Sequence, residues 1–239
     1  MKKHIFFSVK LWKMAGVICA IMFVFVGVVM WGYVTNVAYT KPHYFTIVVD
    51  PGHGGRDVGC SGVSTAVKES DINLAIAKIL KTKLDDYGFR VVLTRSGDYG
   101  LYDDGATNFK LSDMNKRVEL IQKEQADMVI SIHQNSFSDA QLSGAQVFYQ
   151  EGDIKGEVLA SAINKELESG LGKVRGEHNF SDLYLLKESG VLGVLVECGY
   201  LTNVEEEVCL IDAAYQEKVA YAIVSGVIRY LVFQGDQTY

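Results

Sequence analysis

Residues 45–55 read FTIVVDPGHGG, and the rest of the chain has to be consistent with what this run predicts. Its first residues are mostly apolar or β-branched, which is typical of a strand buried on both faces of a sheet. Pro51 and Gly52 then end the strand, because proline cannot continue a central ladder and glycine permits a tight turn. A strand covered on both faces needs helices above and below it, so the run favours an α/β domain.

Strands and helices continue to alternate after this run. Apolar, β-branched segments predict further strands at residues 89–94, 128–132, 145–149 and 191–196. One-sided apolar stripes predict helices at 69–87, 112–125, 154–171 and 215–231, and Asn203 followed by three glutamates predicts another helix start. The expected architecture is a three-layer sandwich, in which helices cover both faces of a largely parallel, mixed sheet.

The N-terminus differs from the rest of the chain. Residues 14–34 carry no charge, and four lysines precede them without any acid. That length can cross a hydrocarbon core of ~30 Å, and the lysines favour a cytoplasmic N-terminus. A cleaved signal peptide is the alternative, but the run exceeds the usual ~7–15 residues and Val37-Ala38 is a poor cleavage site. We expect a basic stub at 1–13, a transmembrane signal-anchor at 14–34, a linker at 35–44 and one exported domain at 45–235.

The charges of the exported part exclude one class of partner. Residues 1–43 hold five lysines and no acid, so the remainder carries 18 basic and 29 acidic side chains, a formal charge of −11. Such a surface repels the phosphate backbone, and no nucleic-acid partner is expected.

The cysteines predict no disulfide framework. Cys19 lies in the apolar run, which leaves Cys60, Cys198 and Cys209, an odd number without C-x-x-C spacing. All three are expected to be buried free thiols.

Four chemically capable residues lie where the predicted strands end. His53 follows the first strand, His133 follows the strand at 128–132, and Glu197 closes the strand at 191–196. Glu69 begins the helix after the 54–68 loop, so it reaches the same edge. Ligands of open α/β sheets gather at the carboxyl ends of the strands, so these side chains are expected to converge.

Two histidines and one glutamate with an open fourth position form a ligand set of zinc hydrolases. A second, unligated carboxylate beside the metal transfers protons during catalysis. Spacing alone leaves open whether Glu69 or Glu197 is the ligand. Each residue taken singly has an ordinary explanation, such as a loop histidine or a glutamate at a helix start, but these explanations do not account for their shared edge. The remaining histidines lack such placement and are expected to be structural: His4, His43 and His178.

Two other site types fit poorly. Gly52 to Gly55 resembles a phosphate cradle, but Asp57 stands where G-x-G-x-x-G needs its third glycine and no G-K-[ST] follows. The nucleophile motif G-x-S-x-G of α/β serine hydrolases is also absent from the sequence.

Four segments resemble one family, the zinc-dependent N-acetylmuramoyl-L-alanine amidases of type 3. The resemblance covers residues 46–231 and rests on VDPGHGG at 49–55, KESDINL at 68–74, SIHQN at 131–135 and VECGYLTN at 196–203. It implies that His53, Glu69 and His133 bind Zn²⁺, that Glu197 is catalytic, and that the substrate is the amide between muramic acid and L-alanine in peptidoglycan.

Within that family, the chain looks most like the germination-specific enzymes of the spore cortex. The short length, the single apolar segment and the motifs SGAQVFY at 143–149, YQEKVA at 215–220 and GVIRY at 226–230 carry this narrower resemblance. It implies a membrane-anchored enzyme facing the space between forespore and mother cell. It also implies a functionally coupled deacetylase that completes muramic-δ-lactam.

Control of activity is expected to come from outside the site. Some relatives carry an inhibitory helix after the second histidine, but about ten residues are too few to build one here. An accessory activating protein or weak metal affinity would replace it. The polar loop at 96–110 is interpreted mainly as solvated, with a role at the substrate groove as the alternative. A catalytically inactive wall-binding scaffold and a zinc peptidase or deacetylase on a similar sheet remain the rival functions.

Overall fold

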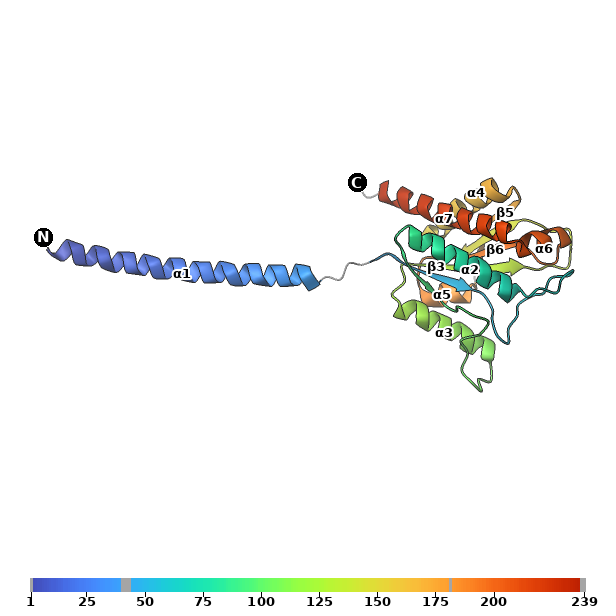
Figure 1. Ribbon diagram of the computed structural model, residues 1–239, viewed down its shortest axis with the longest axis horizontal. Coiled ribbons are helices and arrows are strands. Elements are labelled where there is room, and N and C mark those ends of the chain that lie inside the picture. Colours follow the sequence, from blue (N-terminus) through green and yellow to red (C-terminus); the bar gives the residue numbers. More distant parts are fainter. Residues whose placement is uncertain (1, 40–43, 181, 237–239) are drawn as a thin grey trace. The chain divides into compact units, whose positions relative to one another are not determined.

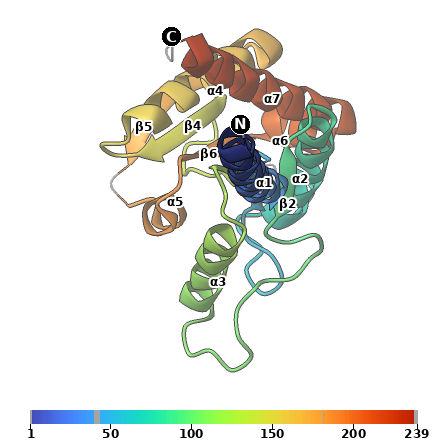
Figure 2. The same ribbon diagram turned by 90° about the vertical axis from the view of Figure 1, so that its left-hand side faces the viewer.

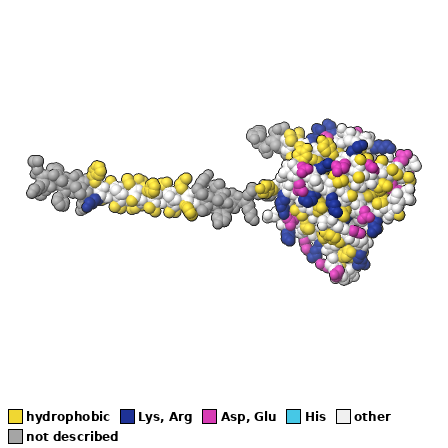
Figure 3. All heavy atoms as spheres, in the orientation of Figure 1, with side chains coloured by type: hydrophobic (Ala, Val, Ile, Leu, Met, Phe, Trp, Pro, Cys, Tyr) yellow, Lys and Arg dark blue, Asp and Glu magenta, His cyan; other side chains and the backbone are white. Residues whose placement is uncertain are grey.

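The computed structural model describes residues 2–39, 44–180 and 182–236, and these divide into two compact units. The first unit, Met1–His43, contains the single helix α1, Lys2–Tyr39. Within the described residues, the segment Trp12–Trp31 has a mean hydropathy of 2.5 and is long and apolar enough to cross a membrane. Its described side chains are almost all apolar (Figure 3). The predicted linker at 35–44 overlaps the end of α1, and its residues 40–43 lie outside the described residues.

The second unit, Tyr44–Tyr239, is built on one six-stranded sheet with the order β2-β1-β3-β6-β4-β5. Strands β1, β2, β3 and β6 are parallel neighbours, whereas β4 runs antiparallel to β6 and parallel to β5. The strands are β1 (Thr46–Pro51), β2 (Arg90–Leu93), β3 (Met128–Asn135), β4 (Ala145–Gln150), β5 (Val174–Phe180) and β6 (Gly193–Tyr200).

Helices cover both faces of this sheet (Figures 1 and 2). Helices α2 (Glu69–Asp86), α4 (Ile154–Leu171) and α7 (Ala213–Asp236) pack on one face, with α6 (Val204–Ile211) beside them. Helices α3 (Phe109–Lys123) and α5 (Tyr184–Ser189) pack on the other. The predicted three-layer α/β sandwich with a mixed sheet is therefore confirmed.

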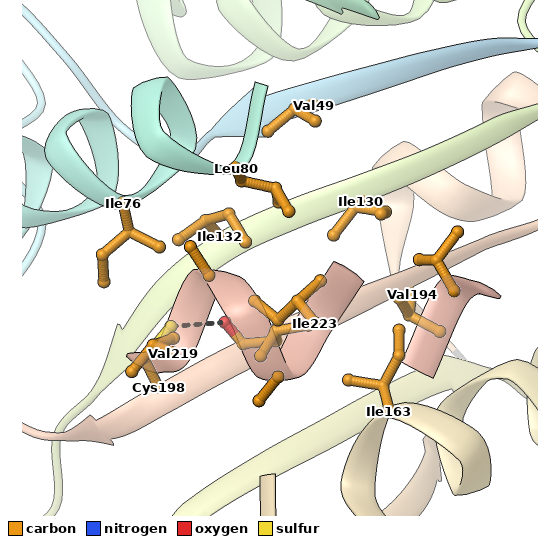
Figure 4. Close-up of a cluster of buried hydrophobic side chains, with 14 of the residues drawn as sticks. Val49, Ile76, Leu80, Ile130, Ile132, Ile163, Val194, Cys198, Val219 and Ile223 are labelled. Carbon is orange, nitrogen blue, oxygen red and sulfur yellow. Dashed lines mark hydrogen bonds between the residues drawn. The ribbon is translucent and has the colours of Figure 1, made fainter. Parts of the chain in front are cut away.

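The larger core fills the space between the sheet and α2, α4 and α7. Alternate strand residues such as Ile130 and Val194 meet Leu80 and Ile223 there, and all four are fully buried (Figure 4). Helices α4 and α7 approach closely at Gly226, where an added Cβ would lie 2.5 Å from Cα of Ile163. The strand residues whose side chains lie on the other face of the sheet point toward α3 and α5.

Two elements escaped the sequence patterns, β5 and α5. Strand β5 lies at the sheet edge beside β4 alone, and its polar sequence VRGEHNF lacks the apolar pattern of a buried strand. Helix α5 has only six residues, which is too short for a helical period to stand out. Helix α3 begins three residues before the predicted Ser112, because the side chain of Asn108 caps it by accepting a hydrogen bond from the N–H of Leu111 at 3.1 Å.

The cysteines are free, but they are not all buried. Cys198 lies in the core, and Cys60 is partly buried. Cys209 is exposed, so the expectation of a buried thiol is wrong there. Its helix, α6, is short and turns that position toward solvent.

Candidate metal centre at the carboxyl edge of the sheet

Parallel strands place the predicted site residues at one edge of the sheet. His53 follows β1, and His133 lies in β3, which pairs with β1 in parallel. Glu197 of β6 is the direct neighbour of His133 across the next parallel pair. Glu69 is the first residue of α2, whose N-terminus approaches the same edge. Strands β3 and β6 both run beyond their predicted ends, so His133 and Glu197 are strand residues.

Three of these four side chains meet at one point. The possible ligand atoms of His53, Glu69 and His133 all lie within 4.8 Å of one another, and the group can hold a metal ion. Oε1 of Glu69 lies 3.2 Å from Nε2 of His53 and 3.0 Å from Nδ1 of His133. The two imidazole rings meet edge to face, with centroids 4.9 Å apart.

The carboxylate of Glu69 is buried and heavily hydrogen-bonded. Burial alone would raise its pKa, but hydrogen bonds and charge interactions with His133 and His53 outweigh burial, so the pKa of Glu69 lies far below its usual range. It is therefore ionised, as a metal-binding carboxylate must be. Its other partners are the N–H of Gln134 at 3.1 Å, the N–H of Cys60 at 2.9 Å and the side-chain amide of Asn73 at 3.3 Å.

Glu197 has a contrasting environment. Its Oε2 is buried and has no hydrogen-bond partner among the described residues. Burial raises its pKa, His133 and His53 lower it and Glu69 raises it, with a net result of about 7. A carboxyl group with a pKa near neutrality can both accept and release a proton. The two glutamates thus have opposite electrostatic characters.

Glycines make room for the imidazoles and the carboxylate. A Cβ on Gly52 would lie 2.2 Å from Nε2 of His133, and a Cβ on Gly59 would lie 2.3 Å from Oε2 of Glu69. Gly54 and Gly55 take φ values of 128° and 61°, which favour glycine. Gly52, in the loop that resembled a phosphate cradle, thus lies directly against His133, and Gly59 lies directly against Glu69.

The carboxylate of Asp57, to which the sequence patterns assigned no role in the site, lies beside His53. Oδ2 of Asp57 is 3.0 Å from Nδ1 of His53, on the ring nitrogen opposite the one that faces Glu69. Burial acts to lower the pKa of His53, but the hydrogen bonds and charges of Glu69 and Asp57 raise it overall. Asp57 itself pairs with Lys110 at 3.2 Å. Only the fold brings Lys110 there.

A cavity of about 320 Å³ opens beside the imidazoles. It lies on the sheet face that carries α3 and α5, and its walls include His53 and His133. The remaining wall includes three aromatic residues: Tyr102, Phe109 and Tyr184. Part of the loop at 96–110 therefore borders the cavity, although Asp103 and Asp104 are exposed as the solvated interpretation expected. Residues 136–144, between β3 and β4, contain no helix, in line with the absence of an inhibitory insert.

Below the site, Asp50 is the centre of a buried polar network. Its carboxylate accepts hydrogen bonds from Thr94 at 2.6 Å, Ser131 at 2.8 Å and Arg117 at 2.5 Å. Burial opposes ionisation, but the charge of Arg117 and these hydrogen bonds lower the pKa of Asp50 to about 2. The sequence did not indicate this network, because Asp50 and its three partners come from four separate segments.

Comparison with known proteins assigns the chain to a class of enzymes. Residues 47–229 match the model of the Amidase_3 family, described as N-acetylmuramoyl-L-alanine amidase. The chain belongs to this family of hydrolases, and the resemblance found in the sequence is confirmed.

The similar proteins include amidases of the kind that the narrower resemblance indicated. The chain is 35% identical to the germination-specific N-acetylmuramoyl-L-alanine amidase of Bacillus subtilis (strain 168) over 194 residues, which is 80% of this chain and 81% of that protein. It is also similar to the CwlD amidase from Clostridioides difficile, solved in complex with the GerS lipoprotein, with a TM-score of 0.76, 36% identity and coverage of 79% of this chain and 98% of that chain. The catalytic domain of CwlV from Bacillus (Paenibacillus) polymyxa var. colistinus gives a TM-score of 0.69 at 31% identity, covering 78% and 97%.

The Asp50 network predicts a specific pH dependence of stability. A pKa lowered to about 2 stabilises the fold above the unfolded pKa of ~3.9, and this contribution is lost as the pH falls through about 2. The shift corresponds to about 2–3 kcal/mol. We therefore expect Asp50→Asn to be less stable than the wild type at pH 6, with the difference narrowing toward pH 2. Urea denaturation of both proteins across this range measures it, and a constant difference would contradict the assignment.

Proposed function

We propose that the chain is a zinc-dependent amidase that cleaves the bond between the lactoyl group of N-acetylmuramic acid and the L-alanine of the stem peptide. The observation that carries the proposal is the convergence of His53, Glu69 and His133 on one point. Beside them, at the adjacent strand position, Glu197 has a carboxyl oxygen with no hydrogen-bond partner in the described part of the chain. Membership of the amidase family supports the choice of substrate.

The donor set fits zinc. Two imidazole nitrogens and one carboxylate oxygen leave a fourth tetrahedral position open, as in catalytic zinc sites. Metal-binding histidines usually donate a hydrogen bond from their second ring N–H to a carboxylate or carbonyl, and Asp57 occupies that place beside Nδ1 of His53. Zinc bound here would supply a Lewis acid that polarises the substrate carbonyl and activates water.

In this proposal, Glu197 transfers a proton from the attacking water to the leaving nitrogen. Its raised pKa and its buried oxygen, which no described residue hydrogen-bonds, suit a group that accepts a proton from the attacking water. The same carboxyl then delivers that proton to the departing nitrogen of L-alanine, and Glu197 returns to its ionised form. Glu69, whose pKa lies far below its usual range, is unsuited to this exchange and is assigned to the metal.

The biological setting is also proposed from the relatives. The Bacillus subtilis relative is named as germination-specific, which supports a role in the spore cortex. There the enzyme would expose muramic acid for a coupled deacetylase that completes muramic-δ-lactam. The Clostridioides difficile relative binds a lipoprotein, which supports an accessory protein for this chain.

We further propose that α1 anchors the enzyme in the membrane, with the catalytic domain at 45–235 outside the cytoplasm. The apolar segment Trp12–Trp31 and the lysines before it support this orientation. Cleavage after α1 would instead release the domain.

The products of digestion test the proposed reaction. Incubated with spore-cortex peptidoglycan, the enzyme is expected to release peptides that begin with L-alanine and to leave glycan strands intact, and a chelator should stop the reaction. Mass spectrometry identifies the products. Shortened peptides or deacetylated sugars in their place would indicate a peptidase or a deacetylase. No product from a zinc-loaded protein, even with its accessory protein present, would indicate an inactive scaffold.

Two variants separate the roles within that assay. Glu197→Gln is expected to lower turnover by at least ~10²-fold while retaining zinc, because it removes only the proton carrier. His53→Ala should lose zinc as well as activity. Near-normal turnover by Glu197→Gln would show that another group transfers the proton.

The location of the enzyme is tested by fractionation. The full-length chain is expected in the membrane fraction, resistant to high salt but extracted by detergent, with its N-terminus protected from external protease. Mass determination of the purified chain checks that its N-terminus is intact. Recovery of a shortened, soluble form would favour the signal peptide over the anchor.

A further inference from the structure

Two arginines are buried in the second unit, Tyr44–Tyr239, and neither is a proposed zinc ligand or proton carrier. Arg95 follows β2, Arg117 lies in α3, and each is about 1% exposed. Arginine is almost never buried to this extent unless all its N–H groups are paired. The identity of those partners therefore indicates what the two side chains do.

Both arginines bind the backbone of the loop that carries His53. Arg117 donates from Nη2 to the carbonyl of His53 at 2.7 Å and from Nη1 to that of Pro51 at 3.0 Å. Arg95 donates from Nε to the carbonyl of Pro51 at 2.9 Å and from Nη2 to that of Gly52 at 2.9 Å. Three successive carbonyl groups are thus fixed by two guanidinium groups.

This loop needs such restraint, because His53 has a φ of 62°. Residues with a side chain rarely adopt this left-handed conformation, and it persists only where surrounding contacts impose it. The hydrogen bond from Arg117 fixes the carbonyl of His53 itself. A loop free to relax would turn the imidazole away from Glu69.

The same two side chains are themselves anchored on other parts of the site. Arg117 is held by Asp50 at 2.5 Å and by Asp113 at 2.7 Å, so its guanidinium has no freedom to rotate. Nη2 of Arg95 also donates to the carbonyl of Ser70 at 2.8 Å, in the first turn of the helix that begins with Glu69. Arg95 therefore joins the segments that supply His53 and Glu69.

We infer that Arg117 and Arg95 are positioning residues, which hold the backbone of residues 51–53 so that His53 meets Glu69 and His133 before the metal arrives. Neither touches the substrate or the metal in this account. The inference rests on the proposed function, since it explains how the proposed zinc ligands are preorganised. Outer partners of metal ligands commonly change metal affinity by about 10–100-fold, and we expect an effect of that size here.

The test is zinc affinity, measured by competition with a chromophoric chelator on the full-length chain in detergent. Arg117→Lys retains the charge beside Asp50, but an ammonium group cannot reach both carboxylates and both carbonyls. It is expected to raise the zinc Kd by about 10–100-fold. Arg95→Lys is the second variant and should act in the same direction. Because all four hydrogen bonds of Arg95 go to carbonyl groups, its replacement leaves no directly paired acid behind.

Ile121→Ala is the matched control. Ile121 is fully buried one helical turn after Arg117 in α3, and its side chain makes no hydrogen bond to the loop. The control should lower the denaturation midpoint and leave the zinc Kd unchanged. The inference is overturned if the arginine variants that fold bind zinc like the wild type, or if Ile121→Ala weakens zinc binding equally. A wild-type chain that binds no zinc, or a His53→Ala variant that binds it normally, would instead overturn the proposed function.

Discussion

The carboxylate of Glu69 is the group on which the site depends, because it contacts both imidazoles from a third segment of the chain. One of its oxygens lies 3.0 Å from Nδ1 of His133 and 3.2 Å from Nε2 of His53. A buried carboxylate is costly unless it is paired, and the partly buried imidazoles of His53 and His133 are its partners here. Because Glu69 is ionised, its interactions with the two imidazoles are favourable even without a metal. The possible ligand atoms of His53, Glu69 and His133 therefore already lie close together.

The fold supplies this arrangement through parallel strands. In parallel pairing, the ends of β1, β3 and β6 reach one edge, and the register sets His133 beside Glu197. The larger core lies on one face of the sheet, where α2, α4 and α7 pack against the strands. Burial of α2 against that core aims its N-terminus, and therefore Glu69, at the edge. Apolar packing on one face thus determines polar geometry at the end of the strands.

Sequence patterns predicted the sandwich and the shared edge of the four site residues, because both follow from strand ends and topology rules. They did not predict Asp57 behind His53, nor the network of Asp50, Arg95 and Arg117. Each of these residues has no distinctive pattern in the sequence, and Asp50, Arg95 and Arg117 are buried by partners that include residues 44 to 81 positions away in the chain. Strand β5 was not predicted for a related reason. It has no apolar pattern of its own and is a strand because it pairs with β4.

X-ray absorption at the zinc edge tests the central claim most directly, because it reports the atoms bound to the metal in the purified, full-length chain. We expect one zinc per chain, bound by two imidazole nitrogens and a carboxylate oxygen at ~2.0–2.2 Å. A spectrum dominated by sulfur at ~2.3 Å, or one with a single imidazole, would contradict it, because the metal would then be held elsewhere than at His53, Glu69 and His133.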